Sequence, residues 1–231
     1  MPYFIQQIVD WSEVWAPLIP LWFYRRSGTK VNWAKPLYYY CLFAFINNFI
    51  STFFWKQIRL GIYDTLKDTL PFLYNQDGTY SNVLLYNTGS LFRFILLSWF
   101  FALLLNRLKS FFITTAALYF LFFVYLFFIT GDVRDFSSPF LGTEAALLLT
   151  YCLIFYFYMI WNEHSSIKNT PPFWAVTGLS VYVVINFPIF LFYNVLSAQS
   201  ENFAINIWDI HNLSYIVFCI LIARSFYVRK H

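Results

Sequence analysis

Charged residues are scarce in this chain of 231 residues. They make up 11% of the sequence, whereas hydrophobic residues make up 60%. Soluble domains carry roughly 25% charged residues, so this composition excludes an ordinary soluble protein. It also provides no basic domain of the kind that binds nucleic acid, and we expect no nucleic-acid partner.

Cysteine, histidine and glycine are also few. The chain has three cysteines: Cys41, Cys152 and Cys219. All three fall within apolar stretches and form no Cys-x-x-Cys or Cys/His pattern, which indicates small core residues with inert thiols. His211 is the only histidine inside an apolar stretch, so neither a bis-histidine haem nor a zinc site is expected. With only 7 glycines and no glycine-rich phosphate loop, the sequence predicts neither a metal nor a cofactor.

Long apolar stretches and aromatic side chains are abundant instead. A helix needs about 20 apolar residues to cross a bilayer, and seven stretches qualify: 3–24, 36–56, 82–105, 111–130, 141–161, 172–194 and 204–227. Continuous runs such as 111–129 lack the alternation of a transmembrane β-barrel. The sequence therefore predicts an all-α polytopic membrane protein, in which residues 1–231 form one seven-transmembrane-helix bundle surrounded by lipid.

Lysine and arginine are distributed unevenly between the predicted loops. Nine lie after spans 1, 3 and 5 and in the C-terminal tail, against four in the other loops. The positive-inside rule then puts the N-terminus outside and the C-terminus in the cytoplasm, as in a multi-pass protein of the cytoplasmic (inner) membrane. No Lys or Arg precedes Arg25, so we expect the first span to be retained. Helical spacing of Ile and Leu in 57–81 predicts a short amphipathic helix on the outer surface.

Arg93 lies in the middle of the apolar span 82–105. A guanidinium at membrane depth costs about 2.5–3.5 kcal/mol even on lenient insertion scales, so a partner inside the bundle is expected. A rise of about 1.5 Å per residue brings Glu13 to the same level, near the midplane. Glu13 or Asp209 is therefore the expected partner of Arg93.

Further polar side chains fall on one stripe of most spans. The candidates for a ligand-binding site or a buried polar network are Arg93, Glu13, Asp10, Asp209, Asn47, Glu144, Asn206 and His211. Most of them belong to the outer half, whereas the inner half is apolar, which predicts an outward-facing polar cavity above an aromatic floor. Interhelical hydrogen bonding is an equal alternative for the asparagines. Span 111–130 carries no charge or amide and is expected at the periphery.

Known membrane chemistries lack their residues here. Span 204–227 has no lysine for retinal, and the chain has neither a Gly-x-Ser-Gly motif nor a His-Glu-x-x-His motif for a membrane protease. The sequence predicts no catalytic residue and favours a protein that is not an enzyme.

Three short aromatic motifs carry a resemblance. Tyr86-Asn87 opens the third span, Phe173-Trp174 opens the sixth, and Trp208 with His211-Asn212 lies in the seventh. With these motifs the chain resembles a family of small, uncharacterised seven-helix bacterial membrane proteins. An acidic residue is expected in that family near Arg93, where this chain departs from the pattern. The resemblance implies a sensory or partner subunit.

These patterns favour a receptor-like sensory module. A small-molecule ligand from the outer side, or a change in the membrane, would alter the network of Arg93, Glu13 and Asp209. Spans 1 and 6, with prolines inside them, would relay the change to a separate cytoplasmic signalling protein. Three alternatives stay open: a small-molecule transporter, a membrane-embedded enzyme that acts on lipid or quinone through Asp10, Glu13 or Asp209, and a structural assembly subunit.

Overall fold

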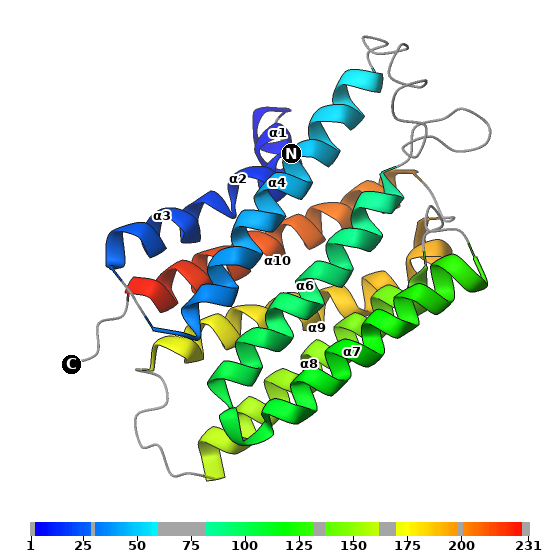
Figure 1. The fold of residues 1–231 in the computed structure, drawn as a ribbon. Coiled ribbons are helices and arrows are strands. Elements are labelled where there is room, and N and C mark those ends of the chain that lie inside the picture. Colours follow the sequence, from blue (N-terminus) through cyan, green and yellow to red (C-terminus); the bar gives the residue numbers. More distant parts are fainter. Residues whose placement is uncertain are drawn as a thin grey trace.

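The computed structural model describes residues 3–28, 31–59, 82–131, 137–161, 170–197 and 201–227. Within these ranges the chain forms helices joined by turns, and no strand occurs among them. The long helices are α4 (Ala34–Arg59), α6 (Val83–Leu104), α7 (Lys109–Val124), α8 (Ser138–Trp161), α9 (Pro171–Ser197) and α10 (Glu201–Tyr227). They run side by side in one bundle (Figure 1). The prediction of an all-helical protein is confirmed for this part of the chain.

Five helical segments are long and apolar enough to cross a membrane. They are Val83–Leu104, Asn106–Ile129, Pro139–Trp161, Pro171–Phe192 and Asn206–Tyr227. These segments coincide with the last five predicted spans and fit a multi-pass helical membrane protein. Helix α4 is long enough but is not among them, and the N-terminal segment is broken into short pieces. The count of seven spans and their orientation stay predictions.

The N-terminal segment consists of three short helices: α1 (Tyr3–Asp10), α2 (Ser12–Trp15) and α3 (Leu18–Ser27). Pro17 stands at the junction between α2 and α3, where its missing N–H removes a helical hydrogen bond and the helix breaks. Pro20 lies in the first turn of α3, where an N–H needs no helical partner. Helix α9 continues through Pro188.

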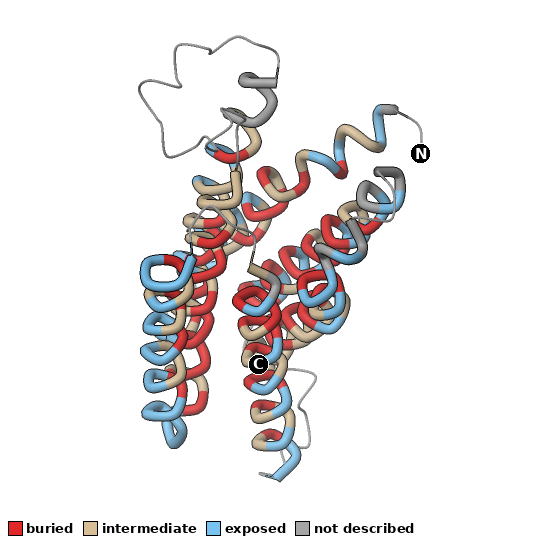
Figure 2. Tube along the Cα trace, turned by 90° about the vertical axis from the view of Figure 1, so that its right-hand side faces the viewer, coloured by how far each residue is buried: buried red, intermediate tan, exposed pale blue. Residues whose placement is uncertain are grey.

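Helices α9 and α10 approach each other closely. A Cβ on Gly178 would lie 2.8 Å from Cβ of Leu221 and 3.2 Å from the backbone oxygen of Phe218. Small residues of this kind let helices in membranes pack backbone to backbone. Helix α8 packs on α9 and α6 packs on α4, while buried residues gather on the facing sides of the helices (Figure 2).

The segment Asn106–Ile129 lies at the periphery of the bundle. It comprises a 3-10 turn η2 (Asn106–Leu108), helix α7 and a π-helical turn η3 (Tyr125–Ile129). Only 22% of its apolar window is buried, against 50% or more in the other four candidate spans. This confirms the prediction from its lack of charges and amides. The predicted amphipathic helix at 57–81 falls almost wholly outside the described residues.

Candidate functional site

Arg93 and Glu144 form an ion pair in the interior of the bundle. Arg93, in the middle of α6, donates from Nε to Oε1 of Glu144 at 2.5 Å and from Nη2 to Oε2 at 2.6 Å. Glu144 lies in the second turn of α8 and its side chain is 2% exposed. Two parallel bonds between guanidinium and carboxylate are the strongest common form of this contact. The prediction that Arg93 pairs with Glu13 or Asp209 is wrong, because α8 rather than α2 or α10 reaches it.

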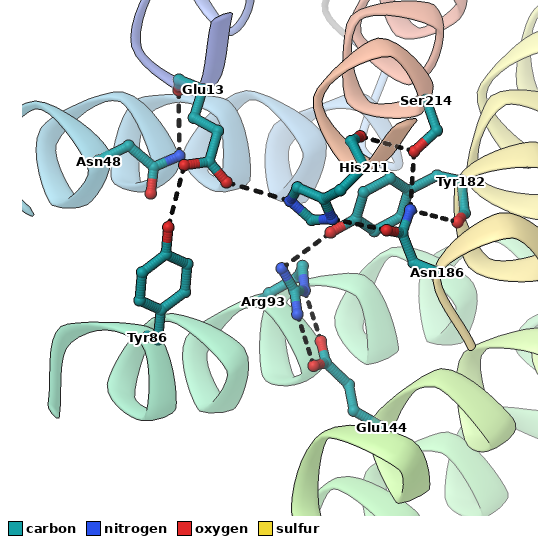
Figure 3. A network of polar contacts seen from close by, with 9 residues as sticks. All are labelled: Glu13, Asn48, Tyr86, Arg93, Glu144, Tyr182, Asn186, His211 and Ser214. Carbon is teal, nitrogen blue, oxygen red and sulfur yellow. Dashed lines mark hydrogen bonds and ion pairs between the residues drawn. The ribbon is translucent and has the colours of Figure 1, made fainter. Parts of the chain in front are cut away.

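Neutral groups complete the surroundings of the ion pair. Ser90, three residues before Arg93, donates to Oε2 of Glu144 at 2.5 Å and lies 3.0 Å from the hydroxyl of Tyr119. The third guanidinium nitrogen, Nη1, donates to the hydroxyl of Tyr182 on α9 at 3.3 Å. Arg93 is thus compensated in charge by Glu144 and tied by hydrogen bonds to α8 and α9 (Figure 3).

Glu13 holds a second cluster together. Its Oε1 lies 3.1 Å from Nε2 of His211 on α10, and its Oε2 accepts a hydrogen bond from the hydroxyl of Tyr86 on α6 at 3.1 Å. Asn48 on α4 donates to the backbone oxygen of Glu13 at 3.0 Å. Three long helices therefore hold the four-residue helix α2 through this one residue (Figure 3).

Asn186 on α9 fixes the hydrogen-bonding state of His211. Nδ2 of Asn186 lies 2.7 Å from the backbone oxygen of Tyr182, which can only accept, so this atom is the amide donor. Oδ1 is then the atom that lies 2.5 Å from Nδ1 of His211, and Nδ1 must carry the hydrogen. Asn186 also donates to Ser214 at 2.7 Å.

A hydrogen bond across the contact between His211 and Glu13 consequently requires a proton between the two side chains. With the Nδ1 hydrogen in place, a neutral imidazole presents a lone pair at Nε2, and a carboxylate would present another. Their separation of 3.1 Å is a hydrogen-bond distance. Either His211 is an imidazolium beside a carboxylate, or Glu13 is a carboxylic acid that donates to a neutral ring; both forms hold one proton between the two residues.

A cavity separates the two clusters. Its walls include Glu13, Arg93, Tyr182, His211 and Tyr215. The cavity and the solvent-open space at its mouth together amount to about 620 Å³, of which about 50 Å³ can hold the centres of water-sized groups. One such group needs roughly 10–15 Å³ of this central volume, so the cavity has room for about four.

The half of the bundle beyond the cavity has a different character. Along α6, α8 and α9, residues 94–104, 145–161 and 171–185 include no charged or amide side chain. Buried rings such as Phe94, Phe101 and Phe155 fill this region. Its polar contacts include pairs of hydroxyls, for example Ser98 with Tyr151 at 3.2 Å, and bonds from Ser180 and Thr150 to backbone oxygens. The structure therefore places a polar cavity next to an aromatic region, and the outward direction predicted for the cavity stays a prediction.

The other predicted site residues lie apart from this cavity or at its edge. Gln6 donates to Asp10 at 3.2 Å and to Asp209 at 2.8 Å, which joins α1 to α10 near one end of the bundle. Asn47 lines the cavity and donates to the backbone oxygen of Leu85 at 3.3 Å. Asn206 is exposed. Of the eight candidates, four meet at the two clusters: Arg93, Glu144, Glu13 and His211.

Five residues of the two clusters are not among the candidates predicted from the sequence: Tyr182, Asn186, Ser214, Ser90 and Tyr86. Four of these stand on polar stripes that the helical period reveals, since Tyr182 and Asn186 are four residues apart and Ser90 is three from Arg93. Their importance comes from bonding to a charged or histidine side chain, which a stripe alone does not show. Ser214 carries no signal beyond being a hydroxyl in an apolar span.

The described residues contain no group of three or more His, Cys, Asp or Glu that could hold a metal ion. The three cysteines are buried free thiols. Comparison with protein-family models, curated proteins and solved structures finds no match for this chain. The resemblance to small seven-helix bacterial membrane proteins therefore stays a prediction.

Proposed function

We propose that this protein is a sensory module of the cytoplasmic membrane, with seven spans, the N-terminus outside and the C-terminus in the cytoplasm. In this topology helix α4 and the broken segment α1–α3 supply the first two spans. The cavity then opens toward the outer side, and the nine basic residues of the inner loops and tail face the cytoplasm.

The observation that carries the proposal is the position of Glu13. This side chain joins α2 to α10 through His211 and to α6 through Tyr86, while its backbone joins α2 to α4 through Asn48. Helix α3 follows at once after the break at Pro17 and ends with Arg25 and Arg26 in its last turn. A change at Glu13 would loosen α2 and shift α3 toward or away from the cytoplasmic side.

Such an arrangement is a two-state element that a ligand could bias. A ligand that binds better when α2 is released from α10 would shift the population toward that state. The stable Arg93–Glu144 pair would keep α6 and α8 fixed during this change. A separate cytoplasmic protein that contacts the basic loops would read the movement of α3.

A transporter has less support from the same observations. A transport path needs polar groups on both sides of a site near the midplane. Here the charged and amide groups of α6, α8 and α9 stop at one level, and the buried rings beyond them fill the remaining half. An enzyme has less support because the acids of the two clusters already have partners: Glu144 in Arg93 and Glu13 in His211.

Affinity purification from native membranes after cross-linking, with mass spectrometry of bound proteins, tests the sensor. We expect one cytoplasmic protein to be enriched, and the Glu13→Gln substitution to change its yield or its signalling output. Asp10→Asn is the matched control, because Asp10 is exposed and its side chain accepts a hydrogen bond from Gln6 rather than from a residue of the Glu13 cluster. Recovery of no partner, together with equal output from both variants, would rule the sensor out.

A further inference from the structure

The cavity holds one negative charge more than it can compensate when the shared proton leaves. Arg93 and Glu144 cancel each other through two short bonds. Glu13 and His211 are neutral as a pair only while they share a proton. The other titratable groups that face this pair are neutral phenols, from α4, α6, α9 and α10: Tyr40, Tyr86, Tyr182 and Tyr215. Without the proton, the cavity therefore carries a net charge of about −1.

Aromatic rings surround this charge. Trp208 stacks on His211 with ring centroids 4.8 Å apart, and Tyr86 meets Trp208 edge to face at 5.7 Å. Phe43 and Phe190 also line the cavity. A carboxylate and aromatic rings in one cavity are the two elements that recognise organic ammonium ions.

A second observation points to an occupant with hydrogen-bonding groups. Tyr215 lines the cavity, and its buried hydroxyl forms no hydrogen bond of normal geometry among the described residues, although Tyr40 and the thiol of Cys219 are its polar neighbours. A buried polar atom without a partner costs about 1–3 kcal/mol relative to one that is satisfied. A ligand that carries several N–H groups could supply the missing contact.

We propose that the cavity binds a small protonated primary amine in place of the proton shared by Glu13 and His211. The ammonium group donates one N–H to Oε1 of Glu13 and another to the lone pair at Nε2 of neutral His211. One alkylammonium ion enters and one proton leaves, so no covalent bond changes and the net charge of the site is conserved. The alkyl chain lies against the rings of Trp208 and Tyr86.

This exchange changes the distance between the helices. A proton fits between atoms 3.1 Å apart. An ammonium nitrogen that makes a hydrogen bond of normal length to each atom, at a tetrahedral angle, holds them about 4.7 Å apart. The amine therefore pushes α2 away from α10, which is the movement required of the sensor. The role of this movement in signalling rests on the proposed function, whereas the binding of the amine does not.

Isothermal titration calorimetry of the full chain in lipid nanodiscs tests the exchange, with n-propylammonium as the probe. This ion has four non-hydrogen atoms, matching the room in the cavity. Titration in buffers that differ in ionisation enthalpy counts the protons released by the unaltered protein. We expect about one proton per bound ion, and an affinity that rises about tenfold per pH unit while the pair holds its proton. Tetramethylammonium has no N–H and should bind at least about tenfold more weakly.

Two variants locate the site. Glu13→Gln removes the carboxylate and should lower the affinity for n-propylammonium about 30-fold or more and abolish proton release. Asp10→Asn should leave both unchanged. Absence of n-propylammonium binding, binding without proton release by the unaltered protein, or equal binding of tetramethylammonium would each overturn the inference.

The outcomes separate this inference from the sensor. If a partner co-purifies and responds to Glu13→Gln but n-propylammonium does not bind, the ligand class is wrong and the sensor stands. If n-propylammonium binds with proton release but no partner and no output exist, the site stands and the sensor is wrong.

Discussion

Asn186 accepts a hydrogen bond from Nδ1 of His211 at 2.5 Å, and this bond sets the direction of the whole Glu13 cluster. The amide is itself oriented by the backbone oxygen of Tyr182 and by the hydroxyl of Ser214, both at 2.7 Å. A backbone carbonyl has only one role in a hydrogen bond, so it determines the roles of every atom that follows. This series of hydrogen bonds ends at Glu13. Among the residues of the series, Glu13 alone belongs to the broken N-terminal segment.

Replacing Asn186 with Leu should destabilise the protein and uncouple His211 from Glu13. The substitution leaves the Nδ1 hydrogen of a buried ring without a partner, at a cost of about 1–3 kcal/mol in unfolding free energy. Thermal unfolding in detergent measures the loss. Asn47→Leu is the matched control, because Asn47 makes a single longer bond of 3.3 Å and should cost about 0.6 kcal/mol. Equal losses for both variants would contradict the assigned role of Asn186.

The sequence predicts much of this fold because the bilayer imposes strong constraints. Length and hydropathy locate the helices, and the absence of charges in 111–130 correctly places that segment at the periphery. The break at Pro17 follows from its missing N–H. These features depend on local composition, which the sequence displays directly.

The pairing of Arg93 could not be predicted in the same way. Glu13, Glu144 and Asp209 stand on three different spans, and the sequence does not say which of these helices lie beside α6. Glu144 lies about one turn nearer the N-terminus of α8 than Arg93 lies to the N-terminus of α6. The expected depth in the membrane alone therefore disfavours Glu144 as the partner of Arg93. The long arginine side chain and the packing of α6 beside α8 bridge that difference. The partner of a buried charge depends on which helices pack side by side. The polar stripe on a single helix does not reveal this.

The ion pair between Arg93 and Glu144 should show strong coupling in a double-mutant cycle. Arg93→Met or Glu144→Met alone leaves a buried charge uncompensated, which costs about 3–5 kcal/mol. The double variant removes both charges and should be more stable than either single variant. Thermal or denaturant unfolding in detergent gives the change in unfolding free energy for the two single variants and the double variant. Glu13→Met combined with Arg93→Met is the comparison pair and should show weaker coupling, because the two side chains line the same cavity but no ion pair joins them. Stronger coupling of Arg93 to Glu13 than to Glu144 would contradict the observed pairing.

Gly178→Val should destabilise the contact between α9 and α10. A Cβ at this position meets Cβ of Leu221 at 2.8 Å and the backbone oxygen of Phe218 at 3.2 Å, and a backbone atom cannot move aside without displacing α10. Overpacking of this kind costs about 1–3 kcal/mol. At Gly142 the nearest atom to an added Cβ is the flexible end of Leu191, at 3.1 Å, so Gly142→Val is the milder control. Thermal unfolding should separate the two variants. Because α10 carries His211, Gly178→Val should also weaken n-propylammonium binding, whereas Gly142→Val should preserve it.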